Sequence, residues 1–275
     1  MRWLMAADIH YSLPQLDWLV EAAPRYDLVI LAGDLLDLGS LVDIDAQIVV
    51  AQAYLRRLAG VTRVIVSSGN HDLDSRGPEG EKVAAWVAET AAEGISVDAG
   101  SLVLGDTLFT ICPWWDGPAT REQVERQLAA DHAARPRRWV WVYHAPPQDS
   151  PTSWTGKRSM GDADLVAWIG RYRPDIVLSG HVHQSPFVRD GSWVDRIGET
   201  WVFNAGHQYG APPAHIAFDG AHEEAVWISA MGVQAVKLGE PLVRPVPPLS
   251  AMPAWFTDPA GSAPSPAPGA AAGGR

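Results

Sequence analysis

Five short segments of this 275-residue chain place histidine, aspartate or asparagine directly after an apolar run. In chain order they are Asp8-Ile9-His10, Gly33-Asp34-Leu35-Leu36-Asp37, Gly69-Asn70-His71-Asp72, a single His144, and Gly180-His181-Val182-His183. Their side chains offer imidazole nitrogens, carboxylate oxygens and one amide oxygen, with no thiolate in any of the five segments. This donor set suits Mn, Fe, Zn, Ni or Co better than a soft thiolate site would.

The spacing of these residues indicates that they bind ions together. In Asp-x-His and His-x-His, an extended backbone points both side chains to the same face, so both can reach one ion. Two ions about 3.5–4 Å apart promote in-line displacement at phosphorus and lower the pKa of a bound water. The pattern therefore predicts metal-assisted hydrolysis of a phosphoester. The candidate metal ligands are Asp8, His10, Asp34, Asn70, His144, His181 and His183, too many for one tetrahedral ion but suited to two ions that share a carboxylate.

Short strands and amphipathic helices alternate through the first two thirds of the chain. The runs at 28–32, 64–66, 108–112, 139–143 and 176–178 are rich in branched or aromatic residues and predict buried strands. Segment 44–58 has an apolar stripe typical of a helix, and helices are also predicted over 79–93, 120–133 and 161–171. This alternation predicts an α/β layered fold, in which the carboxyl ends of the strands bring the five segments to one crevice.

After His183 the predicted strands are no longer separated by predicted helices. The runs at 193–197, 201–203, 215–218 and 224–228 follow one another with only turn residues between them and predict a β meander. From 245 onward Pro, Ala, Gly and Ser dominate. We therefore expect one domain over 1–240 and a Pro/Ala/Gly-rich tail over 241–275 that is disordered from about 258.

Composition limits the classes of function. The chain is 47% hydrophobic and 19% charged, and its formal net charge is −11, which argues against a surface that coats nucleic acid or anionic lipid. Its one cysteine, Cys112, cannot form an internal disulfide and is expected to be a buried strand residue. Neither a signal peptide nor a membrane-spanning run is evident, so we expect a cytoplasmic protein with no membrane association.

The five segments, in this order, resemble the motifs of the calcineurin-like metallophosphoesterase family. The resemblance covers 8–183 and extends to about 229 through Phe203-Asn204-Ala205-Gly206, where Ala205 stands in place of the usual proline. It implies a four-layer α/β fold, in which two mixed β-sheets pack as a sandwich flanked by helices.

The resemblance also implies roles for single residues. One metal ion would bind Asp8, His10, Asp34 and His183, and the other would bind Asp34, Asn70, His144 and His181, with Asp34 as the bridge. His71 would contact the substrate and help to protonate the leaving oxygen, and Asp37 would orient His71. A hydroxide that bridges the two ions would be the nucleophile.

Three further features are hypotheses about the surroundings of the site. His207 follows the Asn204 segment and could approach the cleft. Trp114 and Trp115 could form an aromatic wall for a nucleobase or an aryl group, or could simply pack in the protein interior. Lys157 or Arg158 could contact the substrate phosphate.

The favoured interpretation is hydrolysis of a small phosphodiester. A nucleotide or protein phosphomonoesterase is the alternative, and the sequence leaves the choice between them open, together with the native metals and the oligomeric state. A nuclease is disfavoured by the net charge of −11. A scaffold that has kept the fold and lost its metals is disfavoured because every expected ligand is present.

Overall fold

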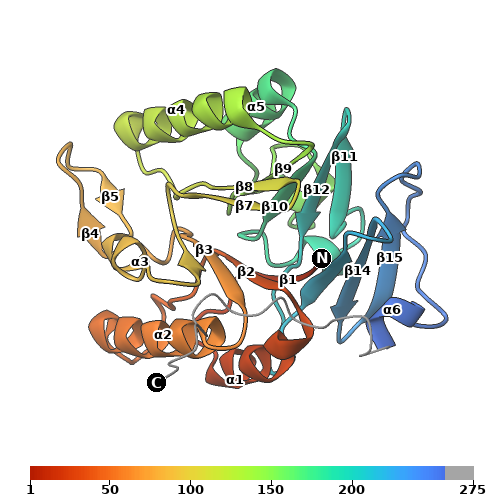
Figure 1. The fold of residues 1–275 in the computed structure, drawn as a ribbon, viewed down its shortest axis with the longest axis horizontal. Coiled ribbons are helices and arrows are strands. Elements are labelled where there is room, and N and C mark those ends of the chain that lie inside the picture. Colours follow the sequence, from red (N-terminus) through yellow and green to blue (C-terminus); the bar gives the residue numbers. More distant parts are fainter. Residues whose placement is uncertain (258–275) are drawn as a thin grey trace, which may run out of the picture.

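The computed structural model describes residues 1–257, so the region predicted to be disordered from about 258 lies outside the described residues. Two large sheets form the centre of the protein (Figure 1). The first has the strand order β15-β14-β13-β1-β2-β3-β6. Its strands are β1 (Arg2–Ala6), β2 (Leu28–Ala32), β3 (Arg63–Ser67), β6 (Ile95–Ser96), β13 (His215–Asp219), β14 (Glu224–Ser229) and β15 (Gly232–Lys237).

The second sheet has the strand order β11-β12-β10-β9-β8-β7. Its strands are β7 (Ser101–Leu104), β8 (Thr107–Ile111), β9 (Arg138–Val142), β10 (Ile176–Ser179), β11 (Val194–Ile197) and β12 (Thr200–Asn204). Both sheets are mixed. In the first, β1, β2, β3 and β6 run parallel and β13 pairs antiparallel with β1. In the second, β8, β9, β10 and β12 run parallel, with β7 and β11 antiparallel at the two edges.

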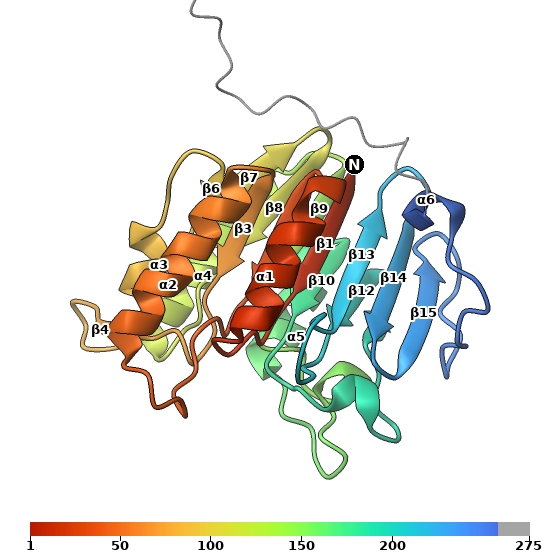
Figure 2. The same cartoon turned by 90° about the horizontal axis from the view of Figure 1, so that it is seen from below.

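Helices cover the outer faces of both sheets. Figure 1 shows α1 (Leu13–Ala22) and α2 (Ile44–Ala59) on the outer face of the first sheet. It shows α4 (Pro118–Ala134) and α5 (Ala163–Tyr172) on the outer face of the second sheet. In Figure 2, α1 and α2 lie across β1, β2 and β3. The remaining short elements are α3 (Ala85–Glu89), α6 (Ala254–Thr257), the 3-10 turns η1 (Ala23–Arg25), η2 (Pro151–Ser153) and η3 (Ser185–Phe187), and the hairpin β4 (Ser75–Arg76) and β5 (Lys82–Val83).

Side-chain alternation along the strands creates three hydrophobic layers. In β1, Leu4 packs toward α1 and α2, whereas Trp3 and Met5 pack between the two sheets. A third layer lies between the second sheet and α4 and α5, where Trp141 packs with Leu128. Because the central strands are covered on both faces, they are apolar throughout rather than alternating. The predicted α/β fold, with two mixed sheets in a sandwich flanked by helices, is confirmed.

The helix predicted over 79–93 is wrong in its first half. Only Ala85–Glu89 is helical there, and β5 occupies Lys82–Val83 as part of a hairpin with β4. Gly77 and Gly80 make the turn of this hairpin. Gly80 has a left-handed backbone (φ 81°), which is incompatible with an α-helix at this position. The helices predicted over 120–133 and 161–171 correspond to α4 and α5.

The single meander predicted after His183 is also wrong. Its first two strands form the β11–β12 hairpin of the second sheet, whereas β13, β14 and β15 form the antiparallel part of the first sheet. The four apolar runs correspond to β11, β12, β13 and β14 and leave out β15, and they do not say which of two sheets each strand joins. Cys112 is buried directly after β8, and its backbone N–H donates to the Val142 carbonyl.

The sequence predicts a Pro/Ala/Gly-rich tail over residues 241–275. The first part of this segment packs on the first sheet. The Leu249 N–H donates to the Val233 carbonyl, and Trp255 is buried with its Nε1–H donating to Glu224 Oε2 at 2.6 Å. Ordered contacts to the sheet therefore continue past 240 and reach α6. Within residues 1–257, no helix is both long and apolar enough to cross a lipid bilayer.

We expect His215 to make folding sensitive to acid. Its side chain is buried against the Trp18 ring, and burial lowers its pKa to about 4 although its Nδ1 bonds to the Pro213 carbonyl. The unfolded chain, with an ordinary histidine pKa of about 6.5, binds this proton first as pH falls. Stability contributed by the neutral ring is therefore lost between about pH 6.5 and pH 4, by about 2 kcal/mol at pH 5 relative to pH 7.

Urea unfolding at pH 7 and pH 5 checks this expectation. Between pH 7 and pH 5, the free energy of unfolding of the His215→Asn variant should fall by about 2 kcal/mol less than that of the wild type. An equal loss in both proteins would show that His215 does not carry the effect.

Candidate metal centre

The five polar segments meet at one edge shared by both sheets. In the first sheet, β1 leads to Asp8 and His10, β2 leads to Asp34, and β3 leads to Asn70. The second sheet contributes three histidines: β9 ends just before His144, and β10 is followed by His181 and His183. Because these strands run parallel within each sheet, their carboxyl ends lie at the same edge, as the sequence predicts.

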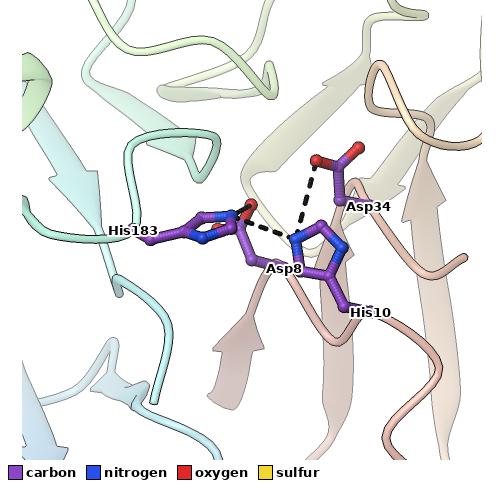
Figure 3. Close-up of side chains that lie close together, drawn as sticks. All are labelled: Asp8, His10, Asp34 and His183. Carbon is purple, nitrogen blue, oxygen red and sulfur yellow. Dashed lines mark hydrogen bonds and ion pairs between the residues drawn. The ribbon is translucent and has the colours of Figure 1, made fainter. Parts of the chain in front are cut away.

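The first cluster consists of Asp8, His10, Asp34 and His183, whose nearest nitrogen and oxygen atoms all lie within 4.8 Å of one another. Figure 3 shows the two imidazoles and the two carboxylates turned toward a common point. Nε2 of His183 lies 3.3 Å from Oδ1 of Asp8 and 3.0 Å from Nε2 of His10. His10 Nε2 is in turn 3.9 Å from Asp34 Oδ2.

The second cluster consists of Asp34, His144 and His181, again with donor atoms within 4.8 Å of one another. Nε2 of His144 lies 3.2 Å from Oδ2 of Asp34. Asn70 adjoins this cluster, because its Oδ1 is 2.8 Å from Nδ1 of His181. Asp34 therefore belongs to both clusters, and the seven predicted ligands are all brought together.

The backbone is left-handed at several of these residues. Asp8, His10, Asp34 and His181 have φ values of 55°, 45°, 56° and 65°. Side chains other than glycine rarely adopt this conformation, which costs about 1–3 kcal/mol per residue and is concentrated at functional sites. At each strand end it turns the chain sharply enough for the side chain to face the clusters.

Two glycines allow the loops to approach the clusters closely. A Cβ atom on Gly69 would lie 2.2 Å from Asp34 Oδ1 and 2.7 Å from His144 Nε2. A Cβ atom on Gly180 would lie 2.6 Å from Asp8 Oδ2. Any larger residue would displace a cluster side chain, which explains glycine at these places in the motifs.

The protonation pattern fits cations at this site. Nδ1 of His144 bonds to the Ala32 carbonyl at 2.6 Å, so it must carry the hydrogen, and a neutral ring then presents a lone pair at Nε2. This lone pair faces the Asp34 carboxylate, and neither His144 Nε2 nor the buried Asp8 Oδ2 has a hydrogen-bond partner among the described residues. A cation between such electron-rich atoms compensates them, and the mixed nitrogen and oxygen donors suit a transition metal.

Charge interactions shift the pKa values of the buried groups in opposite directions. Burial would lower the pKa of His144, but the carboxylates of Asp34 and Asp8 prevail and raise it to about 10. For Asp34, the effect of burial is overcome by His144 and by the His71 N–H, so its pKa is well below the usual range. In the absence of a metal ion, a proton on His144 takes the place of the cation between His144 and Asp34, because the raised pKa favours the charged ring.

His71 and Asp37 lie beside the first cluster. The His71 and His10 rings are 4.6 Å apart, and Asp37, His10 and His71 have donor atoms within 4.8 Å of one another. The His71 backbone N–H donates to Asp34 Oδ1 at 2.8 Å. Asp37 Oδ1 accepts the Gly39 N–H at 2.8 Å, and His71 Nδ1 has no hydrogen-bond partner among the described residues.

Asp72 has a structural role that the sequence analysis did not assign. Its buried carboxylate accepts four backbone N–H groups, from Asp34, Leu35, Leu36 and Gly69, at 2.8–3.1 Å. It thereby ties the loop after β2 to the loop after β3. Burial, together with the Asp34 carboxylate, raises its pKa to about 7. In the sequence, only the position of Asp72 next to His71 in the third motif points to a role for this residue.

The structure brings two of the three surrounding features to the clusters. Nδ1 of His207 lies 2.6 Å from the Asp8 carbonyl oxygen, and its ring is 5.0 Å from His183 of the first cluster. Trp114 reaches the second cluster, with its ring 5.2 Å from that of His181. Lys157 and Arg158 instead lie exposed in the loop between η2 and α5.

Comparisons with known proteins agree with this geometry. The family model described as calcineurin-like phosphoesterase matches residues 1–185, a stretch that contains all five motifs. TT1561 of Thermus thermophilus is a similar solved structure, at 16% identity and a TM-score of 0.55 over 86% of this chain and 98% of that chain. Purple acid phosphatase PPD1 from yellow lupin (Lupinus luteus) seeds is similar at 16% identity and a TM-score of 0.52, over 88% of this chain and 52% of that chain. Both share the fold, and the search of curated proteins found no match.

We expect metal binding to release protons. A ligand imidazole must be neutral, so an ion that uses His144 has to expel the proton that its raised pKa retains. Apparent Mn2+ affinity should rise with pH from about 7 and level off near 10, with about one proton released per chain at pH 8.

Calorimetric titration of the metal-free protein, in two buffers with different ionisation enthalpies, measures this release. His144→Gln should lose most of it, whereas His222→Gln, at an exposed histidine, should keep it. Affinity that does not vary with pH would contradict the assignment.

Proposed function

Because this chain belongs to the calcineurin-like phosphoesterase family, we propose that it hydrolyses a small phosphodiester with the aid of two metal ions. The observation that carries the proposal is the position of Asp34, which is shared by two clusters of nitrogen and oxygen donors. One ion is assigned to the first cluster. The other is assigned to the second cluster together with Asn70. Mn, Fe, Zn, Ni and Co all suit these ligands.

When bound, the two ions supply a hydroxide at neutral pH and stabilise the negative charge on the phosphoryl oxygens. The chain's own residues orient the substrate and move its protons. His71 is assigned the protonation of the departing oxygen, because its ring lies beside His10 of the first cluster. Asp37 is assigned the orientation of His71, which its placement within 4.8 Å supports.

Charge favours a diester over a monoester. A phosphodiester carries one negative charge, whereas a phosphomonoester carries close to two at pH 7. Among the described residues, the pocket that His144 and His181 help to line has no lysine or arginine to balance the additional charge. The phosphomonoesterase is therefore the second choice. A nuclease requires a basic path for its strand, which a net charge of −11 opposes.

Replacement of the shared carboxylate should abolish activity. With Mn2+ supplied, wild-type protein should hydrolyse bis-p-nitrophenyl phosphate with a higher kcat/KM than p-nitrophenyl phosphate. Asp34→Ala should lower kcat/KM for the diester by at least about 10³-fold and reduce the metal content from about two ions per chain. Asp45→Ala, at an exposed aspartate of α2, is the matched control and should retain wild-type activity.

The comparison of the two substrates and the comparison of Asp34→Ala with the wild type test different parts of the proposal. A faster rate with the monoester would replace the diesterase assignment by a phosphatase. Wild-type turnover by Asp34→Ala would overturn the metal assignment.

His71→Ala should separate chemistry from metal binding. Loss of the general acid should lower kcat by about 10²–10⁴-fold while both ions remain bound. The loss should be greater with phenol as the leaving group than with p-nitrophenol, because the poorer leaving group depends more on protonation. Rates and metal content are compared with those of His222→Ala. A variant that loses its metals, or that shows the same loss with both leaving groups, would contradict this role.

A further inference from the structure

A pocket of about 510 Å³ opens beside the second cluster. His144 and His181 form its inner end, so the pocket is continuous with the proposed metal site. Trp114, Trp115 and Met160 supply apolar surface on its walls. Its volume is in the range of pockets that hold small organic ligands, and it accommodates an aromatic ring. The proposed chemistry at phosphorus does not itself require such a pocket.

Trp114 is held in place by the loop that follows β3 and carries Asn70. Its backbone N–H donates to Ser68 Oγ at 2.9 Å, and the Ser68 N–H donates to Asp98 Oδ1 at 2.8 Å. Its ring lies 5.2 Å from His181 and 5.7 Å from His144. The half-buried indole is therefore positioned at the entrance to the second cluster before any ligand binds.

Another wall of the pocket is fixed by a second set of hydrogen bonds. Trp115 Nε1–H donates to the Tyr143 hydroxyl at 2.6 Å, and that hydroxyl donates to Asp162 Oδ2. Asp162 Oδ1 also caps α5 by accepting the Asp164 N–H at 2.7 Å. Both walls are therefore preorganised, which reduces the entropy lost when a rigid ring binds.

The charges around the pocket select against anions. Asp116, Asp162 and Asp164 contribute to its lining, and no lysine or arginine does so among the described residues. Arg121 lies nearby but pairs with Asp164. A ring with a carboxylate or a further phosphate would meet these carboxylates, of which only Asp164 is paired with a cationic side chain in the described part of the chain, whereas a neutral or cationic ring would not be repelled.

The pocket and the proposed general acid lie beside different clusters. His71 packs against His10 of the first cluster, whereas Trp114 packs against His144 and His181 of the second. The departing oxygen must approach His71 to be protonated. The other substituent of a phosphodiester is then directed toward Trp114.

We propose that this pocket binds the alcohol that remains on phosphorus, and that this alcohol carries an aromatic ring without negative charge. The inference rests on the proposed function and deepens it, because it defines one half of the substrate. Trp114 stacks on the ring and determines specificity. Asp116, at the exposed rim, excludes anionic substituents.

Two diesters with the same leaving group test the ring preference. Phenyl p-nitrophenyl phosphate and methyl p-nitrophenyl phosphate both release p-nitrophenol and differ only in the group that is retained. The wild-type kcat/KM should be about tenfold higher for the phenyl diester, in keeping with the strength of aromatic stacking. Trp114→Ala should bring the ratio close to one by slowing only the phenyl diester. Trp18→Ala, on the outer side of the first sheet, should keep the wild-type ratio.

Binding of the retained products gives a readout that does not need turnover. In calorimetry with the Mn2+-loaded protein, phenyl phosphate should bind about tenfold more tightly than methyl phosphate, and Trp114→Ala should remove the difference. A 4-carboxyl group on the phenyl ring should weaken binding to wild-type protein, and Asp116→Asn should restore part of the loss.

The outcomes separate the two proposals. Equal binding of phenyl and methyl phosphate by the wild type, or an equal loss of both in Trp114→Ala, would overturn the pocket assignment. Absence of hydrolysis together with a Trp114-dependent preference in binding would overturn the proposed function and leave the pocket assignment supported.

Discussion

Two carboxylates, those of Asp8 and Asp34, are buried together where the sheets meet, with 0% and 1% of their surfaces exposed. Buried charges of like sign are costly unless hydrogen bonds or cations compensate them. Backbone N–H groups supply part of the compensation, from His181 to Asp8 at 2.9 Å and from His71 to Asp34 at 2.8 Å. The surrounding imidazoles and the proposed ions supply the remainder. The left-handed turns and the close glycines serve this arrangement, because they bring five loops within reach of two carboxylates.

The site also requires both sheets. Asp8, Asp34 and Asn70 follow strands of the first sheet, whereas His144 and His181 follow strands of the second. The clusters are therefore assembled only when the sheets pack through the layer that contains Trp3 and Phe109, whose rings are 5.4 Å apart. Packing defects in that layer shift one half of the site relative to the other, so stability and activity are coupled through geometry.

The candidate ligands could be predicted from the sequence because each motif is local and follows an apolar strand. The rule that parallel strands share their carboxyl edge then groups Asp8 with Asp34 in one sheet and His144 with His181 in the other. It does not predict that the two sheets bring His10 and His183 side by side. Asp72 could not be assigned a role in this way, because its carboxylate binds backbone groups of a different loop.

Two other features show where local patterns stop being informative. The sequence around Trp114 favours packing over a wall, whereas the structure places its ring beside His144 and His181, with its backbone N–H bonded to Ser68. The turn of the β4–β5 hairpin overlaps the start of segment 79–93, whose apolar stripe predicts a helix, and the left-handed backbone of Gly80 prevents a helix there.

The pairing of β1 with β13 imposes an order on biosynthesis. Trp3 lies opposite Phe218, so a central strand of the first sheet finds one neighbour only after most of the chain has been made. Until then the hydrogen-bonding edge of β1 that β13 will occupy is open, and an open apolar strand is a template for association with other chains. Such long-range pairing also slows folding, because the entropy of closing a large loop is lost before the stabilising contacts between the two strands form. The strand that carries the first metal-binding motif is thus synthesised before the other strands of its sheet, and the sheet is completed only after β13 has been made.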